Sequence, residues 1–103
     1  MMTTIHITLD SKQDALEKYL PFIKQGALLT NSELQILFGE EVNLVVKISE
    51  LQQEFACKGK IVWVSVDELQ NKKSFGIQLL ADEGFELNQV LENYLVGLIK
   101  HDK

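Results

Sequence analysis

The chain has 103 residues, of which 46% are hydrophobic and 24% charged, so it fits one globular domain spanning residues 1–103. Its net charge is −5, and all ten basic residues are lysine. Proteins that bind nucleic acid neutralise phosphates with basic patches, usually rich in arginine. This composition therefore argues against DNA or RNA as a partner, and against docking on an anionic membrane.

The first predicted elements are a strand and a short helix. Ile5 to Leu9 alternates apolar and polar side chains, which is the periodicity of a strand. Ser11 lies three residues before Asp14 and can cap a helix. The apolar face of this helix comprises Ala15, Leu16, Tyr19 and Leu20. Pro21 is expected to end it, because proline disfavours the helical conformation of the preceding residue.

The middle of the chain is predicted to form strands joined by turns, since its apolar and β-branched runs are separated by polar or glycine-containing segments. The expected strands are Ala27–Thr30, Glu33–Phe38, Val42–Ile48, Phe55–Val66 and Phe75–Leu80. Between them, Glu50–Glu54 is expected to be a turn. Asp67–Ser74 is expected to be a polar loop with Asn71, Lys72 and Lys73 at its tip.

The C-terminal segment predicts an amphipathic helix, because its apolar residues recur at intervals of three and four. These residues are Leu87, Val90, Leu91, Tyr94, Leu95, Leu98 and Ile99. Asp82 and Glu83 near the start, and Lys100 and Lys103 near the end, suit the helix dipole. Short strands and one such helix indicate a mainly β fold, a small antiparallel barrel or sandwich with a helix laid across it.

Few residues are suited to catalysis or metal binding. His6 and His101 lie near opposite ends of the chain and belong to no motif, so ordinary surface or strand positions explain them. Cys57 falls within a predicted strand, where a cysteine usually acts as a small core hydrophobe. A solvated turn explains Glu40–Glu41, and helix capping explains Asp82–Glu83. We therefore expect no enzymatic activity, no cofactor and no metal site.

The sequence also predicts a cytoplasmic location. A single cysteine cannot form an internal disulfide, which suits the reducing cytosol. Met1 to Leu9 lacks the positive and apolar regions of a signal peptide. No stretch approaches the roughly 20 apolar residues that a membrane-spanning helix requires, so no membrane insertion is expected.

The longest predicted strand contains the most informative surface residue. In strict alternation, Ile61 and Trp63 would share one face, with Val62, Val64 and Val66 on the other. Both faces would then be apolar, so either the C-terminal helix covers the second face or part of it binds a partner. Exposed Trp and Tyr are enriched in interface hot spots. Trp63 and Tyr19 are therefore the candidate protein-binding residues, with core packing as the alternative explanation for each.

Several segments carry a family resemblance. They are Tyr19–Leu29 (YLPFIKQGALL), Lys58–Val64 (KGKIVWV), Ser74–Leu79 (SFGIQL) and Glu92–Gly97 (ENYLVG). In this order they resemble the type IV pilus assembly PilZ proteins over nearly the whole chain. The resemblance implies a six-stranded antiparallel β-barrel with a short helix after the first strand and a C-terminal helix.

The ligand motifs of most PilZ domains are missing. Most members bind cyclic di-GMP through Arg-x-x-x-Arg and Asp/Asn-x-Ser-x-x-Gly. This chain has no arginine and, aligned on Gly26, carries Pro21 and Ile23 at the Asp/Asn and Ser positions. Each charge-assisted hydrogen bond from arginine to phosphate contributes roughly 1.5–3 kcal/mol. We therefore expect no useful affinity for cyclic di-GMP.

By resemblance, the chain is expected to be a non-catalytic adaptor in type IV pilus biogenesis and twitching motility. Its expected partners are the pilus-extension ATPase PilB and the EAL domain of FimX, with Tyr19 and Trp63 matching aromatic positions of the ATPase-facing surface. The family often contacts FimX through a C-terminal extension, and this chain ends at Lys103. The ATPase contact is therefore the stronger expectation.

Two other functions remain open. A second-messenger module could bind cyclic di-GMP at an atypical site that uses Lys12, Lys18 and Lys24, and a basic cluster beside Gly26 would favour this function. A small enzyme would require a polar pocket that holds His6 or Cys57 beside a partner residue.

Overall fold

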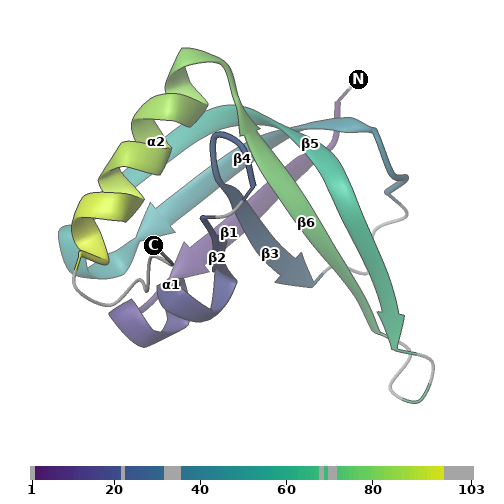
Figure 1. The fold of residues 1–103 in the computed structure, drawn as a ribbon, viewed down its shortest axis with the longest axis horizontal. Coiled ribbons are helices and arrows are strands. Elements are labelled where there is room, and N and C mark those ends of the chain that lie inside the picture. Colours follow the sequence, from purple (N-terminus) through teal and green to yellow (C-terminus); the bar gives the residue numbers. More distant parts are fainter. Residues whose placement is uncertain (1, 22, 32–35, 68, 70–71, 97–103) are drawn as a thin grey trace.

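The fold is a curved six-stranded sheet with two helices, seen in a computed structural model that describes residues 2–21, 23–31, 36–67, 69 and 72–96 (Figure 1). The strands are β1 (Thr4–Leu9), β2 (Tyr19–Leu20), β3 (Ala27–Asn31), β4 (Glu41–Ile48), β5 (Gln53–Asp67) and β6 (Lys72–Leu80). The α-helices are α1 (Lys12–Lys18) and α2 (Ala81–Tyr94), and a short 3₁₀ helix, η1, spans Ser49–Leu51. The predicted mainly β fold is confirmed.

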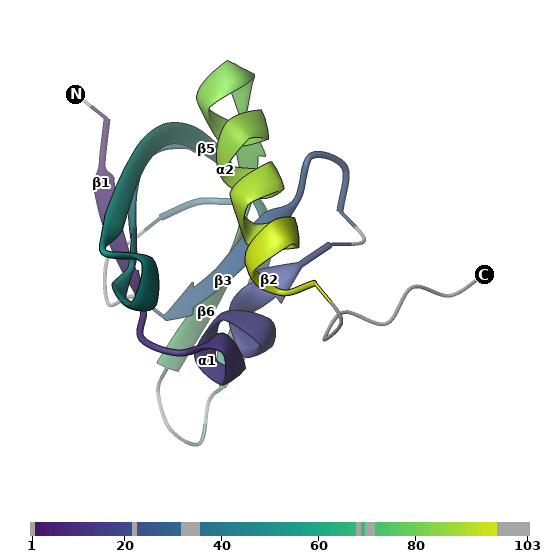
Figure 2. The same cartoon turned by 90° about the vertical axis from the view of Figure 1, so that its left-hand side faces the viewer.

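The sheet has the strand order β1-β4-β5-β6-β3-β2 and curls into a half-barrel (Figures 1 and 2). Four of its pairings are antiparallel, but β1 runs parallel to β4, with Ile5 opposite Leu44. The expectation of a wholly antiparallel barrel is therefore wrong at this edge. The reason is topological: α1, β2 and β3 lie between β1 and β4, and a connection of this length allows a parallel return.

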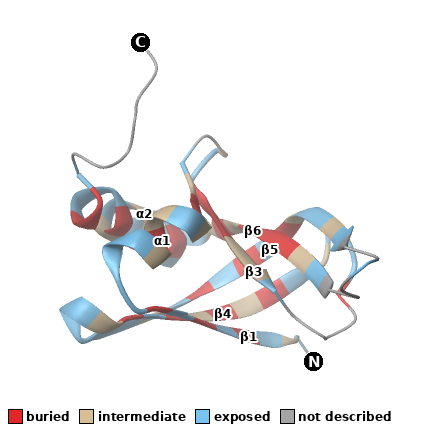
Figure 3. Cartoon of the chain, turned by 90° about the horizontal axis from the view of Figure 1, so that it is seen from below, coloured by how far each residue is buried: buried red, intermediate tan, exposed pale blue. Residues whose placement is uncertain are grey.

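The core lies between the inner face of the sheet and α2, and buried residues from both meet there (Figure 3). Alternate residues of each long strand point inward, as their period of two requires. The fully buried side chains include Leu9, Leu28, Leu44, Ile48, Ile61, Phe75, Ile77, Leu79, Leu87, Leu91 and Leu95. No helix in the described part of the chain combines the length and apolar character needed to cross a bilayer.

The first helix begins as predicted but ends earlier. Ser11 Oγ accepts a 3.0 Å hydrogen bond from the backbone N–H of Asp14, so the predicted cap is confirmed. The helix stops at Lys18, and Tyr19 adopts an extended backbone that starts β2. Tyr19 and Leu20 therefore do not belong to the helical face predicted for them. Pro21 disfavours the helical conformation of Leu20, and the pairing of Tyr19 with Leu28 of β3 extends the chain one residue earlier.

Strand pairing shortens the predicted turns. The predicted turn over residues 50–54 is reduced, because η1 and the left-handed residue Gln52 reverse the chain and β5 starts at Gln53. The predicted polar loop at 67–74 is also shorter, since Asp67 pairs with Lys72 and Val66 with Lys73. Of the predicted strand at 33–38, residues 33–35 lie outside the described residues. Residues 36–38 are not a strand, and Phe38 enters a turn at Gly39.

The C-terminal helix has the predicted orientation. Leu87, Leu91, Tyr94 and Leu95 are buried and Val90 packs against them, while Asp82 and Glu83 occupy the first turn. Leu98, Ile99, Lys100 and Lys103, which the sequence placed at its end, lie outside the described residues. The helix therefore closes the open side of the half-barrel with the apolar stripe that its sequence predicts.

Gly84 of α2 packs closely against Leu79 of β6, and its substitution tests this packing. A Cβ at position 84 would lie 2.8 Å from the carbonyl carbon of Leu79. We expect Gly84→Ala to lower the free energy of unfolding by about 1–2 kcal/mol, because overpacking exceeds the gain of roughly 1 kcal/mol in helix propensity. Urea unfolding followed by circular dichroism measures this. Glu86→Ala, on the exposed side of the same helix, is the control, and equal stability of both variants would contradict the close approach.

Candidate functional site

A β-bulge decides which way Trp63 points. Ile61 pairs with Ile77 and Trp63 pairs with Gly76, so Val62 is an extra residue in β5 without a partner of its own in β6. Directly paired residues share a face, and alternate residues of β6 point to opposite faces. Ile61 is therefore fully buried, whereas Trp63 lies on the outer face and is 43% exposed. The predicted shared face of Ile61 and Trp63 is wrong.

Glycine forms the floor beneath the indole ring. A Cβ on Gly76 would lie 3.0 Å from Trp63 Cβ and 3.8 Å from Leu20 Cδ1, so only glycine fits here without displacing these side chains. Leu29 of β3 pairs with Gly76 from the other side and shares its face. We call this group the Trp63 patch, which consists of Leu20, Leu29 and Trp63 around Gly76.

Polar groups border the Trp63 patch on two sides. On one side Ser74 Oγ donates a 2.7 Å hydrogen bond to Asn31 Oδ1. On the other, Gln78 Nε2 donates a 2.9 Å bond to the backbone carbonyl of Lys24. An apolar centre with an indole ring and a polar rim is the usual anatomy of a protein–protein interface.

Tyr19, the second candidate residue, is buried instead of exposed. Its side chain is 4% exposed, and its hydroxyl donates a hydrogen bond to Asn88 Oδ1 of α2. Asn88 in turn donates a 3.3 Å bond to Glu92. Burial, and then the negative charge of Glu92, raises the pKa of Tyr19 to about 12. Tyr19 therefore fastens β2 to α2, and its neighbour Leu20, which points to the opposite face, reaches the patch.

Gly26 lies under the same contact between β2 and α2. It adopts a φ of +80°, which favours glycine, and a Cβ there would overlap Asn88 Oδ1. The ring carbon Cε1 of Tyr19 would be 3.2 Å away. Side chains of α2 and β2 thus occupy the space over the turn before β3.

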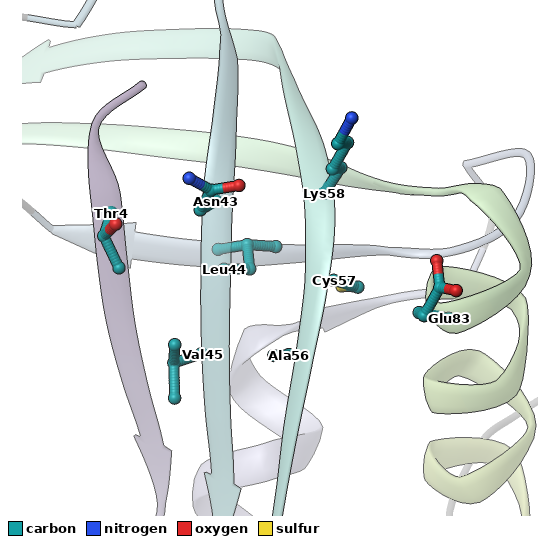
Figure 4. Close-up of a pocket in the computed structure, with 8 residues that line it drawn as sticks. All are labelled: Thr4, Asn43, Leu44, Val45, Ala56, Cys57, Lys58 and Glu83. Atoms are coloured by element: carbon teal, nitrogen blue, oxygen red, sulfur yellow. The ribbon is translucent and has the colours of Figure 1, made fainter. Parts of the chain in front are cut away.

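Cys57 lines an open depression over β1, β4, β5 and the first turn of α2 (Figure 4). Burial, and then the carboxylate of Glu83, raises the pKa of the Cys57 thiol to about 11. The thiol therefore stays protonated and un-nucleophilic at neutral pH, as expected for a core cysteine. Within the described ranges, no three His, Cys, Asp or Glu side chains are arranged to hold a metal ion.

The other residues considered for catalysis or metal binding have ordinary positions or lie outside the described residues. His6 is exposed on β1, and His101 lies outside the described residues. Glu40 Oε1 accepts a 3.1 Å hydrogen bond from the N–H of Leu37, so it stabilises the turn before β4. Among the described residues, the Trp63 patch is a surface suited to binding a protein partner. Sequence reasoning named its tryptophan but missed Leu20, Leu29 and Gly76, and a bulge leaves no simple signal in a sequence.

Both tyrosines of the chain should lose their hydroxyl protons at a higher pH than an ordinary tyrosine, because their pKa values are raised. Burial and the hydrogen bond from the Tyr94 hydroxyl to Glu50 raise the pKa of Tyr94 to about 12, like that of Tyr19. We expect absorbance at 295 nm to show no tyrosinate in the folded protein at about pH 10.5, where an unfolded chain shows it. Because the folded pKa values are raised, stability is complete below about pH 10 and falls as the pH rises toward 12. A folded protein that titrates near pH 10 would contradict the burial of these hydroxyls.

Comparisons with known proteins agree with this architecture. The PilZ domain family matches residues 1–97. A comparison with curated proteins gave no match. PilZ domains are binding and adaptor modules and not enzymes, which fits a structure whose described residues hold an exposed apolar patch and a protonated, buried thiol. The half-barrel, its covering helix and the family match together show that this chain belongs to the PilZ domain family.

Proposed function

We propose that this PilZ domain is a non-catalytic cytoplasmic adaptor in type IV pilus biogenesis and twitching motility, and that it binds a PilB-type ATPase through the Trp63 patch. The observation that carries the proposal is the outward position of Trp63, 43% exposed over Gly76 between two leucines. The segments that resemble the pilus proteins, Tyr19–Leu29 and Lys58–Val64, contribute Leu20, Leu29 and Trp63 to this patch.

The patch is suited to binding because it is preorganised. Trp63 projects from a paired strand and rests against the backbone of Gly76, so its position is fixed before a partner arrives. Binding then costs less side-chain entropy than it would for a mobile loop residue. Burying the exposed part of an indole in a pocket of the partner is the type of contact that dominates interface energetics.

Tyr19 contributes to this proposal indirectly. Its side chain is buried against α2, so it does not offer the partner a large contact area. We propose that Tyr19 positions its neighbour Leu20, whose Cδ1 approaches the floor of the patch. Loss of binding on substitution of Tyr19 would then arise from displacement of β2.

Cyclic di-GMP binding at an atypical site is the alternative, and the surroundings of Gly26 weaken it. The side chains over Gly26 belong to Asn88 and Tyr19 instead of lysines. Lys18 pairs with Asp14 at 3.2 Å, and the Lys12 ammonium lies 5.5 Å from the centre of the Tyr94 ring. Lys24 is exposed. A FimX-type EAL domain remains the second proposed protein partner, and it rests on the family resemblance alone.

Calorimetric titration into the purified ATPase from the same organism tests the adaptor function. We expect Trp63→Ala to weaken binding by more than about 2 kcal/mol, because a hot-spot indole is lost. Phe85→Ala is the matched control, since Phe85 is an aromatic residue that is 51% exposed and belongs to α2, which contributes no residue to the patch. Circular dichroism must show both variants folded. Wild-type protein that fails to bind, or equal losses in both variants, would refute the proposed contact.

A separate titration tests the nucleotide alternative. Without arginine forks for the phosphates, we expect cyclic di-GMP to bind no more tightly than about 100 μM. Calorimetry with the folded wild-type chain measures this directly. Micromolar affinity that is lost in Lys24→Ala would instead establish a lysine-based nucleotide site.

A further inference from the structure

The first strand forms one edge of the sheet and lacks the features that usually protect an edge. β1 has six residues with no charge and no proline, and among the described strands it pairs with β4 alone. The opposite edge, β2, has two residues and is followed by Pro21. Charges, proline and short length are common means of preventing edge-to-edge pairing. β1 is therefore the edge suited to accept another strand.

One hydrogen bond shows which backbone groups of β1 face outward. The carbonyl of Thr3 accepts a 2.8 Å bond from the N–H of Asn43 on β4. Alternate residues of a strand direct their backbone groups to opposite sides, so Ile5 and Ile7 also bond toward β4. β1 lies at the edge of the sheet (Figures 2 and 3). The N–H and C=O groups of Thr4, His6 and Thr8 therefore face outward, where no described strand pairs with them.

The side chains of β1 leave this edge rigid and accessible. Ile5, Ile7 and Leu9 are 5%, 3% and 0% exposed, so the core fixes the strand from its inner face. Thr4, His6 and Thr8 are exposed on the outer face. A second strand could thus add to the edge without displacing a buried residue.

We infer that β1 pairs antiparallel with β1 of a second copy of this chain, about a two-fold axis at His6. In this register Thr4 lies opposite Thr8 of the second copy, and Ile5 lies opposite its Ile7. All the outward backbone groups of the strand then meet outward groups of the other chain. Pairs of threonines and of β-branched residues are favourable across strands.

A neighbouring register is less suitable. An axis at Ile7 would place Thr4 opposite Asp10 of the second copy. The N–H of Asp10 already donates a 3.1 Å hydrogen bond to Asp14, so it is not free to pair. The axis at His6 instead places Asp10 opposite Met2, beyond the paired residues. We therefore assign the two-fold axis to His6.

The charges near His6 permit this contact. On β4 the residue opposite His6 is Val45, and the nearest ionisable group on that strand is Lys47, opposite Thr8. On β5 the residue paired with Val45 is Ala56, and Glu54 and Lys58 lie two positions before and after it on the same strand. Every opposed pair in the proposed register is uncharged or formed by His6 with itself. This self-complementarity favours a second copy over an unrelated partner strand.

The expected dimer is weak and independent of the Trp63 patch. A contact made by one strand is smaller than the roughly 1,200 Å² of stable complexes, so it should dissociate reversibly. β4 separates β1 from β5, which carries Trp63. Failure of ATPase binding and failure of dimerisation would therefore be separate results.

Sedimentation velocity of the full chain tests the proposal between about 10 μM and about 1 mM, where small interfaces dissociate. We expect a monomer–dimer equilibrium in the wild type. His6→Lys and His6→Glu should each weaken the dimer about fivefold, because like charges then face each other across the axis. An equimolar mixture of the two variants should restore it, because lysine then faces glutamate. Ala56→Lys adds the same charge to the outer face of β5. Because β5 lies between β4 and β6 and not at an edge, this variant should leave the dimer unchanged.

A second variant tests the register in the opposite direction. Thr4→Lys combined with Thr8→Glu in one chain should tighten the dimer, because each lysine would face a glutamate of the second copy. Circular dichroism confirms the fold of every variant. A wild-type monomer throughout the concentration range would overturn the proposal. So would a dimer that Ala56→Lys weakens as much as His6→Lys, or a mixture no stronger than its components.

Discussion

The half-barrel depends on α2, because its sheet leaves β1 and β2 at separate edges and cannot enclose its own inner face. Leu87, Leu91 and Leu95 are fully buried against that face, and burying each such side chain contributes roughly 1.5–3 kcal/mol. Two tyrosine hydroxyls fasten the helix, one near its middle and one at its last residue. Tyr19 bonds to Asn88, and Tyr94 bonds to Glu50 before β5. Because the helix is held close to the sheet, Gly26 lies close to Asn88 of α2, and Gly84 of α2 lies close to Leu79 of β6.

With the inner face covered by α2, the outer face is left to present side chains to a partner. The bulge at Val62 reverses the alternation of β5 and moves Trp63 from the core side to this face. Gly76 then accommodates the indole, as glycine commonly does beneath a cross-strand aromatic ring. Tyr19 and Leu20 are adjacent but point to opposite faces of the sheet. Tyr19 points inward and bonds to α2, whereas Leu20 points outward and reaches the Trp63 patch.

The family assignment identifies a binding or adaptor module, and the Trp63 patch is the basis of the protein-binding function proposed above. Two described surfaces of this sheet are unpartnered in different ways. The patch offers apolar side chains, whereas the edge of β1 offers backbone hydrogen-bonding groups. An adaptor with two separate contacts could bind a partner while it associates with itself. In such an arrangement the first contact would raise the effective concentration for the second, so that two weak contacts bind more tightly together than either does alone.

Local pattern determined a large part of this protein. Ser11 as a helix cap, the alternation in β1 and β4, and the stripe on α2 were all predictable, because each depends on residues a few positions apart. The sequence alone also showed the lack of arginine and the family likeness. Cys57 in the core followed from its place in an apolar strand.

Tertiary structure decided the rest. The parallel pairing of β1 with β4 joins residues about forty positions apart, and the bulge at Val62 depends on how β5 meets β6, so neither follows from local periodicity. A single extra residue reverses every later side chain of a strand, which is why Trp63 was predicted beside Ile61 but lies opposite to it. Tyr19 was predicted on a helix, as a candidate protein-binding residue with core packing as the alternative. It is buried because α2, distant in sequence, supplies the hydrogen-bond acceptor for its hydroxyl.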